Sequence, residues 1–520
     1  MTIQIDMSRL EIIGSFASAL EAMEDGKRNL FITGKAGTGK STLLSCFRNK
    51  TNRNTVVVAP TGVAAVNIGG QTIHSFFGFK PDITIEKARR AANRLVKNDN
   101  AEIYQQLDTM VIDEVSMVRA DLFDCVDAFL RIARGDNSLP FGGIHLIMIG
   151  DPYQLPPVVT SSERPLFEGH YISPYFFDSH TFAELDVEII ELEKIYRQSD
   201  KHFIRLLNMI RNNTIDAKAL TVFNARCDPN FETEDNGWIH LTSLNREADS
   251  VNEKRLRKLK GRSRKYIANV SGDFDKKAYP ANDELLLKTG TQVMLLNNDA
   301  EGRWINGTIG QVVKMYADEV EVQIADGPIE RIEPFTWKMF HYEIDKNRSS
   351  IISKPIGSFS QLPLMLAWAI TIHKSQGKTF DRAIIDIGRA FATGQTYVAL
   401  SRLRTLEGMV LKKPLKKGHV RVDYRVMKFM TGYRYAESEL QMPFEEKVEM
   451  IKSAIDCRAR LKITYLKTND TKSKRIIKPI KIGKMEYSGR IFPGIIAMCE
   501  LRSEERVFRV DRILEMEVIL

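Results

Sequence analysis

A glycine-rich segment near the N-terminus has the residue types and spacing of a phosphate-binding loop. Residues 34–41, GKAGTGKS, match G-x-x-x-x-G-K-[ST], follow an apolar stretch that predicts a strand, and precede a helical pattern. Glycines let backbone N–H groups converge on a phosphate at a helix N-terminus, where the lysine reaches the β and γ oxygens and the hydroxyl ligates Mg²⁺. The segment predicts a nucleoside triphosphate site, whereas a turn that binds nothing would not need both flanks. The predicted nucleotide-binding residues are Gly34, Ala36, Gly37, Thr38, Gly39, Lys40, Ser41 and Thr42, with Lys40 also catalytic and Ser41 also a metal ligand.

Two further apolar segments end in side chains suited to hydrolysis. Residues 109–112 predict a buried strand followed by Asp113 and Glu114. We assign Asp113 to the Mg²⁺ shell and Glu114 to the base or positioner of an attacking water. Residues 143–150 predict another strand, followed by GDPYQLPP, in which Gln154 is a candidate sensor of the γ-phosphate. Acidic residues after a strand are common, but downstream of the phosphate loop they indicate hydrolysis and not binding alone.

The elements that must position these residues alternate between short apolar strands and helical patterns, which predicts an α/β fold with parallel sheets covered by helices. A polar, helix-favouring insert at about residues 80–102 separates the second and third strands of the first sheet. Residues 364–370, LMLAWAI, are helix-like. The first-sheet strands are expected at 30–34, 55–60, 109–113 and 143–150, and those of a second, similar sheet at 187–193, 237–243, 382–387 and 408–411.

Two regions are β-rich without helical periodicity. From about 286 to 356, short strands alternate with turn signals, including Asn306-Gly307 and Asp326-Gly327, which predicts a small inserted β-barrel. Near the C-terminus, a helix at 445–459 precedes strands at 461–466, 475–481, 491–500 and 506–510. The expected domains are 1–183, a first α/β domain; 184–286 with 357–433, a second; 287–356, the insert; and 434–520, a helix with a second small β-barrel.

Composition limits the class of protein. The chain has 520 residues and 59.2 kDa, enough for several domains, and its 43% apolar and 27% charged residues exclude a disordered or collagen-like chain. Residues 358–373, the most apolar charge-free stretch, are too short and polar to span a bilayer. The N-terminus shows no secretory signal, which predicts a cytoplasmic protein. Five widely spaced cysteines fit neither a disulfide framework nor a zinc site, so we expect them to be reduced and mostly buried.

Positive charge is concentrated near the C-terminus. The whole chain carries 75 Lys and Arg against 66 Asp and Glu, a net charge of +9. Residues 451–520 hold 16 basic against 9 acidic residues, a net +7, so the first 450 residues are nearly neutral. A polyanionic partner is therefore expected to meet bulk charge in the last module and individually placed groups elsewhere.

The ordered motifs resemble those of superfamily-1 helicases over about residues 25–430. They are DEVSM at 113–117, GDPYQLPP at 150–157, SHTFAEL, LEKIYRQ, WAITIHKSQGKTF at 368–380 and YVALSRLRT at 397–405. Residues 59–77 and 121–144, the latter ending in PFGGI, resemble the Pif-type helicases in particular. The resemblance implies two RecA-like domains with ATP and Mg²⁺ between them, and 5′-to-3′ movement. It also implies that the arginines Arg197 and Arg402 offset charge on the transferred phosphoryl group and that Gly377 closes on the γ-phosphate.

The resemblance places single-stranded DNA across both domains. Phe76 and Phe77 are candidates for base stacking, with core packing as the alternative. Pro156 is expected to abut bases or simply to stiffen its loop. Family members usually carry an adenine-reading glutamine before the phosphate loop, and residues 9–29 contain none, so the sequence does not predict selectivity for ATP over other triphosphates. The other predicted DNA-binding residues of these domains are Thr61, Gly62, His74, Ser75, Thr371, His373, Lys374 and Ser375.

The C-terminal module resembles a WYL domain, a small β-barrel found in bacterial regulators and associated with nucleic-acid or nucleotide binding. The resemblance rests on Tyr465, on Arg475 with Pro479, and on the ending FRVDRI, whereas the naming triplet is replaced by residues 495–497, IIA. A phosphate backbone is one expected ligand of the basic set, and a solvated charged face is the alternative. The set comprises Tyr465, Arg475, Arg506, Arg509 and Arg512.

The sequence thus predicts an ATP-dependent DNA helicase that moves on single-stranded DNA, binds junctions between single- and double-stranded DNA, and unwinds duplexes, with quadruplex and RNA–DNA structures as further candidate substrates. We expect a monomer associated with the bacterial nucleoid and not with a membrane. Two alternatives remain open. One is a DNA-dependent ATPase that remodels protein–DNA complexes without separating strands, and the other is a switch that senses a nucleotide or DNA end through the WYL-like module.

Overall fold

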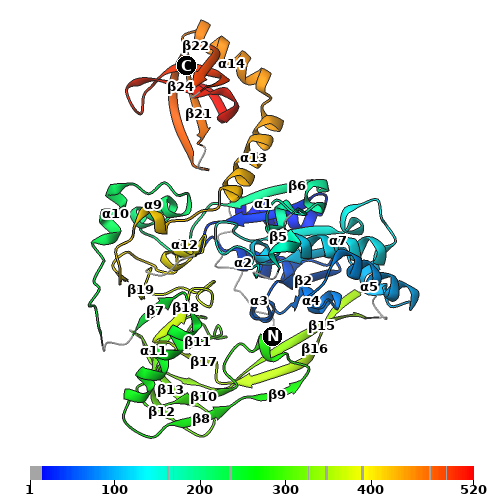
Figure 1. The fold of residues 1–520 in the computed structure, drawn as a ribbon, viewed down its shortest axis with the longest axis vertical. Coiled ribbons are helices and arrows are strands. Elements are labelled where there is room, and N and C mark those ends of the chain that lie inside the picture. Colours follow the sequence, from blue (N-terminus) through cyan, green and yellow to red (C-terminus); the bar gives the residue numbers. More distant parts are fainter. Residues whose placement is uncertain are drawn as a thin grey trace. The chain divides into compact units, whose positions relative to one another are not determined.

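The computed structural model describes residues 14–160, 163–167, 169–233, 237–325, 327–345, 350–387, 392–467, 470–487 and 489–519 (Figure 1). Backbone contacts divide the chain into two compact units. Unit 1 comprises Met1–Leu207 and Asp216–Arg421, and unit 2 comprises Asn208–Ile215 and Val422–Leu520. The phosphate loop and the helicase-like motifs of both predicted α/β domains fall in unit 1.

The first half of unit 1 is a six-stranded parallel sheet in the order β3-β2-β4-β5-β1-β6. Its central strands are buried almost throughout, because helices cover both faces, and this accounts for their nearly continuous apolar sequences. The elements are α1 (Ser15–Asp25), β1 (Asn29–Gly34), α2 (Lys40–Lys50), β2 (Thr55–Ala59), α3 (Gly62–Asn67), β3 (Gln71–Thr72), α4 (Ile73–Phe77), α5 (Ile85–Lys97), α6 (Glu102–Gln105), β4 (Thr109–Ile112), α7 (Ala120–Arg134), β5 (His145–Ile149), α8 (Arg164–Phe167) and β6 (Val187–Leu192).

The strand expected at 187–193 lies where predicted but belongs to the other sheet. It forms β6 and pairs in parallel with β1, from Asn29↔Val187 to Gly34↔Leu192. The assignment to the second sheet was wrong because an apolar strand pattern does not specify its partner. The pairing has a functional consequence: the carboxyl end of β6 emerges beside the phosphate loop, which follows β1.

The second half of unit 1 is a four-stranded parallel sheet in the order β18-β7-β19-β20. The helix expected at 364–370 is absent, since this segment forms two short strands that pair with β11 and β7. A short apolar run does not distinguish a buried strand from a buried helix, which explains the error. The elements are α9 (Lys201–Arg211), α10 (Ala217–Asn224), β7 (Trp238–Thr242), α11 (Asn245–Lys258), β17 (Leu364–Leu366), β18 (Ala369–Thr371), β19 (Arg382–Ile385), α12 (Gln395–Leu400) and β20 (Met409–Leu411).

The inserted β-rich region consists of antiparallel sheets. Asn306 and Gly307 lie near the end of the long connection, residues 296–308, between the paired strands β11 and β12 and do not form a two-residue hairpin turn, whereas Asp326 lies outside the described residues. Strands β15 and β16 form a long hairpin, yellow-green in Figure 1, whose Tyr342 hydroxyl bonds the backbone of Val57 on β2. The strands are β8 (Arg264–Ile267), β9 (Asn269–Gly272), β10 (Glu284–Leu287), β11 (Gln292–Leu295), β12 (Ile309–Met315), β13 (Val320–Ile324), β14 (Ile329–Ile332), β15 (Phe335–Asp345) and β16 (Ser350–Gln361).

Unit 2 contains two helices and a five-stranded antiparallel sheet in the order β24-β23-β22-β21-β25. The predicted helix and four strands are present, and a fifth strand, β25, was not predicted. Apolar side chains of α14 and of the sheet form one core. The elements are α13 (Tyr424–Gln441), α14 (Phe444–Asp456), β21 (Arg460–Leu466), β22 (Lys472–Tyr487), β23 (Arg490–Cys499), β24 (Glu504–Arg509) and β25 (Ile513–Ile519).

The five cysteines are free thiols. Cys46, Cys125 and Cys499 are buried, Cys227 is half-buried and Cys457 is exposed. Among the described residues, no helix combines the length and the apolar character needed to cross a bilayer.

Candidate nucleotide and DNA site

The phosphate loop connects β1 to α2, as the motif requires. The Lys40 ammonium donates to the carbonyl oxygens of Gly34 at 2.7 Å and of Lys35 at 3.2 Å. The Thr38 hydroxyl donates to Lys35 O at 3.0 Å, which closes the loop on itself. Lys40 is thereby held across the mouth of the loop, where the β and γ oxygens of a triphosphate are expected. Ser41 is exposed and Thr42 half-buried in the first turn of α2.

Gly37 lacks a side chain where the segment after β6 crosses the loop. A Cβ on Gly37 would lie 2.5 Å from the Cβ of Arg197, and the residue has a φ of 81°, a conformation that favours glycine. The backbone N–H of Tyr196 donates to Gly37 O at 2.8 Å. The pairing of β6 with β1 therefore brings Arg197 directly onto the phosphate loop.

Arg197 connects the two halves of unit 1. Its guanidinium donates to the Thr379 hydroxyl at 2.9 Å, to Ser401 O at 3.2 Å and to Gly377 O at 3.3 Å. Burial lowers its pKa to about 10. The neighbouring Gln198 amide also donates to Ser401 O, at 3.1 Å. The first half of the unit is thus hydrogen-bonded to both motifs of the second half.

Arg402 is 1% exposed, and its guanidinium donates to Val398 O and to the Ser401 hydroxyl. Burial, and next the charge of Arg197, lower its pKa to about 9, whereas Glu114 and Asp151 oppose that shift. On the adjoining helix α12, the Tyr397 hydroxyl accepts a hydrogen bond from the backbone N–H of Ala36 at 3.0 Å. The second half of unit 1 therefore contributes Tyr397 to the phosphate loop, and it places Arg402 within electrostatic range of Arg197, Glu114 and Asp151.

The acidic residues lie at the carboxyl ends of β4 and β5. Burial and the charge of Glu114 raise the pKa of Asp113 to about 7. Burial also raises the pKa of Glu114, although Lys40 and Arg402 oppose the shift. Asp151 is fully buried and accepts hydrogen bonds from Tyr153 N and, at 3.1 Å, from the Gln154 amide.

This donor set fits a divalent cation. Mg²⁺ prefers oxygen ligands and is commonly held by one or two carboxylates together with substrate phosphates. The Ser41 hydroxyl and Asp113 offer such oxygens beside the loop. The raised pKa of Asp113 shows that its ionised form lacks sufficient compensating positive charge, which a bound cation would supply.

The segment that contains Gly377 contacts the acidic site on one side and the insert on the other. The Gln376 amide donates to the Glu114 carboxylate at 3.2 Å. The Lys378 ammonium donates to the Asn306 side-chain oxygen at 2.6 Å, and burial lowers its pKa to about 8. The side chains on either side of Gly377 therefore contact the Glu114 carboxylate and the inserted region.

The predicted DNA-binding residues of unit 1 divide by exposure. Thr61, Ser75, His373 and Lys374 are exposed, His74 and Pro156 are half-buried, and Thr371 and Ser375 are buried. Gly62 is covered by the insert, because a Cβ there would lie 2.6 Å from the Cβ of Ala278.

Phe76 and Phe77 do not present a face for base stacking. They are 4% and 3% exposed and pack edge-to-face on each other at 4.9 Å between ring centroids. Tyr104 contacts both rings, and Phe129 contacts Phe77. The stacking hypothesis was wrong for both residues. The alternative of core packing holds for both, because side chains from α6, α7 and β15 surround the two rings.

Comparison with known proteins agrees with this geometry. The family model described as PIF1-like helicase matches residues 12–220, and the WYL domain model matches 446–518. The ATP-dependent DNA helicase PIF1 of Homo sapiens is 35% identical over 83% of this chain and 65% of its own length. The ATP-dependent DNA helicase Pif1 of Bdellovibrio bacteriovorus is 32% identical over 77% of this chain and 88% of its own length. The chain belongs to the Pif1 helicase family.

A solved Pif1 helicase extends the comparison to the fold. The crystal structure of Bacteroides sp. Pif1 in complex with ADP-AlF4 aligns with a TM-score of 0.76 at 35% identity, over 82% of this chain and 97% of that chain. The structure of Bacteroides Pif1 bound to ssDNA aligns with a TM-score of 0.57 at 33% identity over the same shares. This chain spans less than two thirds of the human protein.

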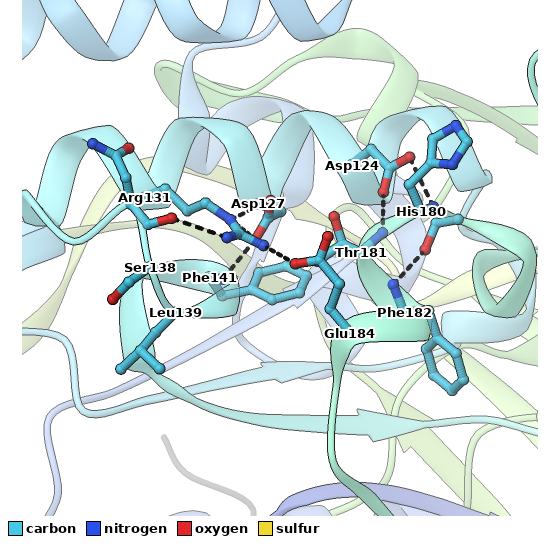
Figure 2. Close-up of polar contacts among 12 residues, drawn as sticks. Asp124, Asp127, Arg131, Ser138, Leu139, Phe141, His180, Thr181, Phe182 and Glu184 are labelled. Atoms are coloured by element: carbon cyan, nitrogen blue, oxygen red, sulfur yellow. Dashed lines mark hydrogen bonds and ion pairs between the residues drawn. The ribbon is translucent and has the colours of Figure 1, made fainter.

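Residues 121–144, whose sequence resembles the Pif-type helicases, form most of α7 and the loop that follows it (Figure 2). Side chains of α7 hold this loop in place. The Asp127 carboxylate accepts from Phe141 N at 2.6 Å and from the Arg131 guanidinium at 2.8 Å, and Arg131 also pairs with Glu184. One turn earlier on α7, Asp124 accepts from the backbone N–H groups of His180 and Thr181. These carboxylates fasten two loops to one helix, and neither points into the nucleotide site.

The WYL-domain residues differ in their surroundings. Arg475 is 9% exposed, and Arg506 is exposed. Arg509 pairs with Asp511 at 2.6 Å, and its backbone N–H donates to the Tyr465 hydroxyl. Arg512 is half-buried. Arg506 approaches Glu504 more loosely, at 3.7 Å, so the ion pairs of the basic set differ in closeness.

Three residues of the site were not predicted. Asp151 lies two residues after the end of β5, so its position near the carboxyl end of a buried strand was an available signal. Gln376 precedes Gly377 in a motif that was identified, but nothing in the sequence indicates that its amide reaches Glu114. Tyr397 contacts the phosphate loop across 361 positions of sequence, and such a contact has no local signature.

Proposed function

We propose that this Pif1-family chain couples ATP hydrolysis to movement along single-stranded DNA and to duplex unwinding in the 5′-to-3′ direction. The observation that carries the proposal is the convergence of Arg197, Arg402 and Gln376 on the phosphate loop and Glu114. A protein that only binds nucleotide needs no complete hydrolytic set built from two halves. The names of the human and Bdellovibrio relatives, and the ADP-AlF4 and ssDNA complexes of Bacteroides Pif1, support the substrate classes.

In this proposal the residues have distinct roles. Lys40 binds the β- and γ-phosphate oxygens. The Glu114 carboxylate orients the attacking water and accepts its proton. Gln376 and Gln154 position the two reactants, which are this water and the triphosphate. Bound Mg²⁺, held through Ser41 and Asp113, supplies neutralisation of phosphate charge. The remaining residues, Arg197 and Arg402, stabilise the charge that develops on the transferred phosphoryl oxygens, an effect of about 10³–10⁵ in rate in other NTPases.

In this proposal, hydrolysis is coupled to movement because residues from both halves of unit 1 contact the same nucleotide. Thr61 and Ser75 belong to the first sheet's half of unit 1, and His373 and Lys374 belong to the second. A change in the spacing of the halves during each ATP cycle shifts one pair of DNA contacts relative to the other. We further propose that the WYL domain adds phosphate contacts from the set Tyr465, Arg475, Arg506 and Arg509.

Strand displacement on duplexes with a single-stranded tail tests the proposal. Wild-type protein with ATP and Mg²⁺ is expected to unwind the 5′-tailed duplex and not the 3′-tailed one. The Lys40→Ala variant is expected to bind the tail and to unwind neither. Unwinding from the 3′ tail alone would overturn the polarity. DNA-stimulated hydrolysis without unwinding of either duplex would replace a helicase with an ATPase that remodels protein–DNA complexes.

A further inference from the structure

The loop 296–308, which connects β11 to β12 in the insert, is held by its own side chains. The indole N–H of Trp304 donates to the Asn297 side-chain oxygen at 3.2 Å, and the backbone N–H of Asn306 donates to the Asn298 side-chain oxygen at 2.8 Å. Trp304 is 7% exposed and belongs to the apolar core of the insert. The loop is therefore fastened to that core and presents Asn306 in a defined orientation.

This loop packs directly on Lys378, a half-buried residue of the segment 376–379. The Lys378 ammonium donates to the Asn306 side-chain oxygen at 2.6 Å. A Cβ on Gly307 would lie 3.1 Å from the Cβ of Lys378, and Gly307 has a φ of 103°, a conformation that favours glycine. Burial lowers the pKa of Lys378 to about 8, and within the described part of the chain Lys378 forms no ion pair. A charged donor therefore meets a neutral acceptor at close range.

The other three residues of this segment contact the residues proposed to act in hydrolysis. The Gln376 amide donates to the Glu114 carboxylate at 3.2 Å. The Arg197 guanidinium donates to the Thr379 hydroxyl at 2.9 Å and to the Gly377 carbonyl oxygen at 3.3 Å. One short segment therefore touches the acidic site, the arginine and the insert.

The insert is also bonded to the first half of unit 1, through the hairpin β15–β16 (Figure 1). The Tyr342 hydroxyl accepts a hydrogen bond from the backbone N–H of Val57 on β2 at 2.9 Å. The backbone N–H of Ile351 donates to the Asn54 side-chain oxygen, also at 2.9 Å. The insert is therefore held to the first sheet at one place and to the segment 376–379 at another.

A directed hydrogen bond at Lys378 does more than fill space. Lys378 is covalently adjacent to Gly377 and Thr379, so a displacement of Lys378 moves the two groups that accept from Arg197. Displacing a group by about 1 Å in an active site can lower the rate about 10²-fold. An apolar side chain could fill the same volume, but it would not fix the orientation of the backbone as a hydrogen bond does.

We propose that the insert positions the nucleotide site through Lys378, whose hydrogen bond to Asn306 holds the segment 376–379 in the geometry that hydrolysis needs. Lys378 and Asn306 are positioning residues, because they act through Gln376, Gly377 and Thr379. The inference rests on the proposed ATP hydrolysis and adds the inserted region as an element that sets its rate.

Steady-state ATP hydrolysis by the full-length protein with saturating oligo-dT tests the contact. Asn306→Ala should lower kcat about tenfold and change KM for ATP by less than about twofold. Asn306→Asp keeps an acceptor oxygen and should retain at least about half of the wild-type kcat. Ile305→Ala shortens the neighbouring side chain, which is 50% exposed, and is the control. Equal kcat values for Asn306→Ala and Asn306→Asp would overturn the proposal. The rates are normalised to the number of sites that bind a fluorescent ADP analogue, so that misfolded protein is not counted as slow enzyme.

A double-mutant cycle provides the second measurement. Lys378→Met and Asn306→Ala remove the two partners of one hydrogen bond, so the double variant should hydrolyse ATP about as fast as either single variant. A further loss of about tenfold in the double variant would show that the two side chains act independently and would contradict the proposal. Lys40→Ala is assayed alongside. Absence of hydrolysis by the wild type would overturn the proposed function itself, whereas a wild-type rate in Asn306→Ala would overturn only the positioning contact.

Discussion

Arg402 is buried and Arg197 is half-buried, and burial is the main reason that the pKa of each is lowered. The acidic residues opposite them have raised pKa values for the same reason. A triphosphate with Mg²⁺ would supply negative charge to the arginines and positive charge to the carboxylates. The site is therefore electrostatically complete only when it is loaded, which is the arrangement expected of preorganised transition-state stabilisation.

Gly37 tests the contact between the phosphate loop and the arginine segment. Gly37→Ala places a Cβ 2.5 Å from the Cβ of Arg197, so Arg197 must move and its bonds to Thr379 and Gly377 must weaken. We expect kcat for ATP hydrolysis to fall by at least about tenfold, with a smaller change in KM.

Gly78→Ala is the matched control for this substitution. Gly78 also has a positive φ, 63°, but a Cβ there would have no atom within 4 Å. Both variants carry similar backbone strain, of about 1 kcal/mol. Equal loss of activity in the two variants would show that strain, and not the contact with Arg197, is responsible.

Lys378 gives the unfolding free energy a defined pH dependence. Burial lowers its pKa to about 8 from an ordinary value near 10.5. Between these pH values the unfolded chain binds more protons at this residue than the folded chain, so its contribution to stability increases as the pH rises. Below about pH 8 both states are protonated, and the cost of burying the charge is fully present.

Lys378→Met removes this titration. We expect the stability of the wild type relative to the variant to increase between pH 8 and 10, by no more than about 1.4 kcal/mol per pH unit. Denaturant midpoints at several pH values measure the difference. A constant difference between wild type and Lys378→Met across this range would contradict the assignment.

At the scale of elements, the sequence predicted strands well and their partners poorly. The strands β1, β2, β4 and β5 were found because buried parallel strands are short, apolar and bounded by turn residues. Partner choice depends on contacts distant in sequence, which is why β6 was assigned to the wrong sheet. The helix predicted at 364–370 was wrong for a different reason, because seven apolar residues can be buried equally well in a helix or in a strand.

The distinction between local sequence patterns and contacts that are distant in sequence also applies to the candidate site. The phosphate loop, Asp113 and Glu114 are predictable because their chemistry needs fixed local spacing. Tyr397 and Gln376 act across the boundary between two sheets, where only folding creates the contact. Base stacking was predicted for Phe76 and Phe77, whereas both are core residues. A pair of aromatic residues in a motif does not indicate which side chains, distant in sequence, will cover their rings.

The α7 element makes a prediction that concerns folding and not catalysis. Asp127→Ala leaves the Arg131 guanidinium and the Phe141 N–H without their buried acceptor. We expect destabilisation of about 3 kcal/mol, measured as a lower melting temperature and as faster hydrogen exchange at residues 136–144.

Glu184→Ala is the control, because it removes the more exposed of the two acids that pair with Arg131, and it should cost less than about 1 kcal/mol. Similar melting temperatures for the two variants would exclude a structural role for the buried carboxylate.

At the scale of the whole molecule, the excess positive charge lies in the last 70 residues, whereas the predicted DNA contacts of the first 450 residues are individual side chains. The first 450 residues carry 59 basic and 57 acidic residues, and the last 70 carry 16 and 9. Of the four exposed candidates for DNA contact in unit 1, Thr61 and Ser75 carry hydroxyls and Lys374 carries an ammonium group, so few of these contacts depend strongly on salt. Most of the salt dependence of DNA binding should therefore come from the WYL domain.

Removal of the WYL domain tests this division. A chain that ends at Gln441 keeps α13 whole, whereas an end at Arg434 would cut the helix at the residue that pairs with the buried Asp470. We expect the shortened chain to bind oligo-dT more weakly and with a less negative salt slope, because its phosphate contacts come from few cations. Fluorescence anisotropy between 50 and 200 mM salt measures both quantities. Hydrolysis without DNA should be retained, since the phosphate loop and both arginines lie in unit 1, and unchanged affinity and slope would make the domain a docking module for another protein.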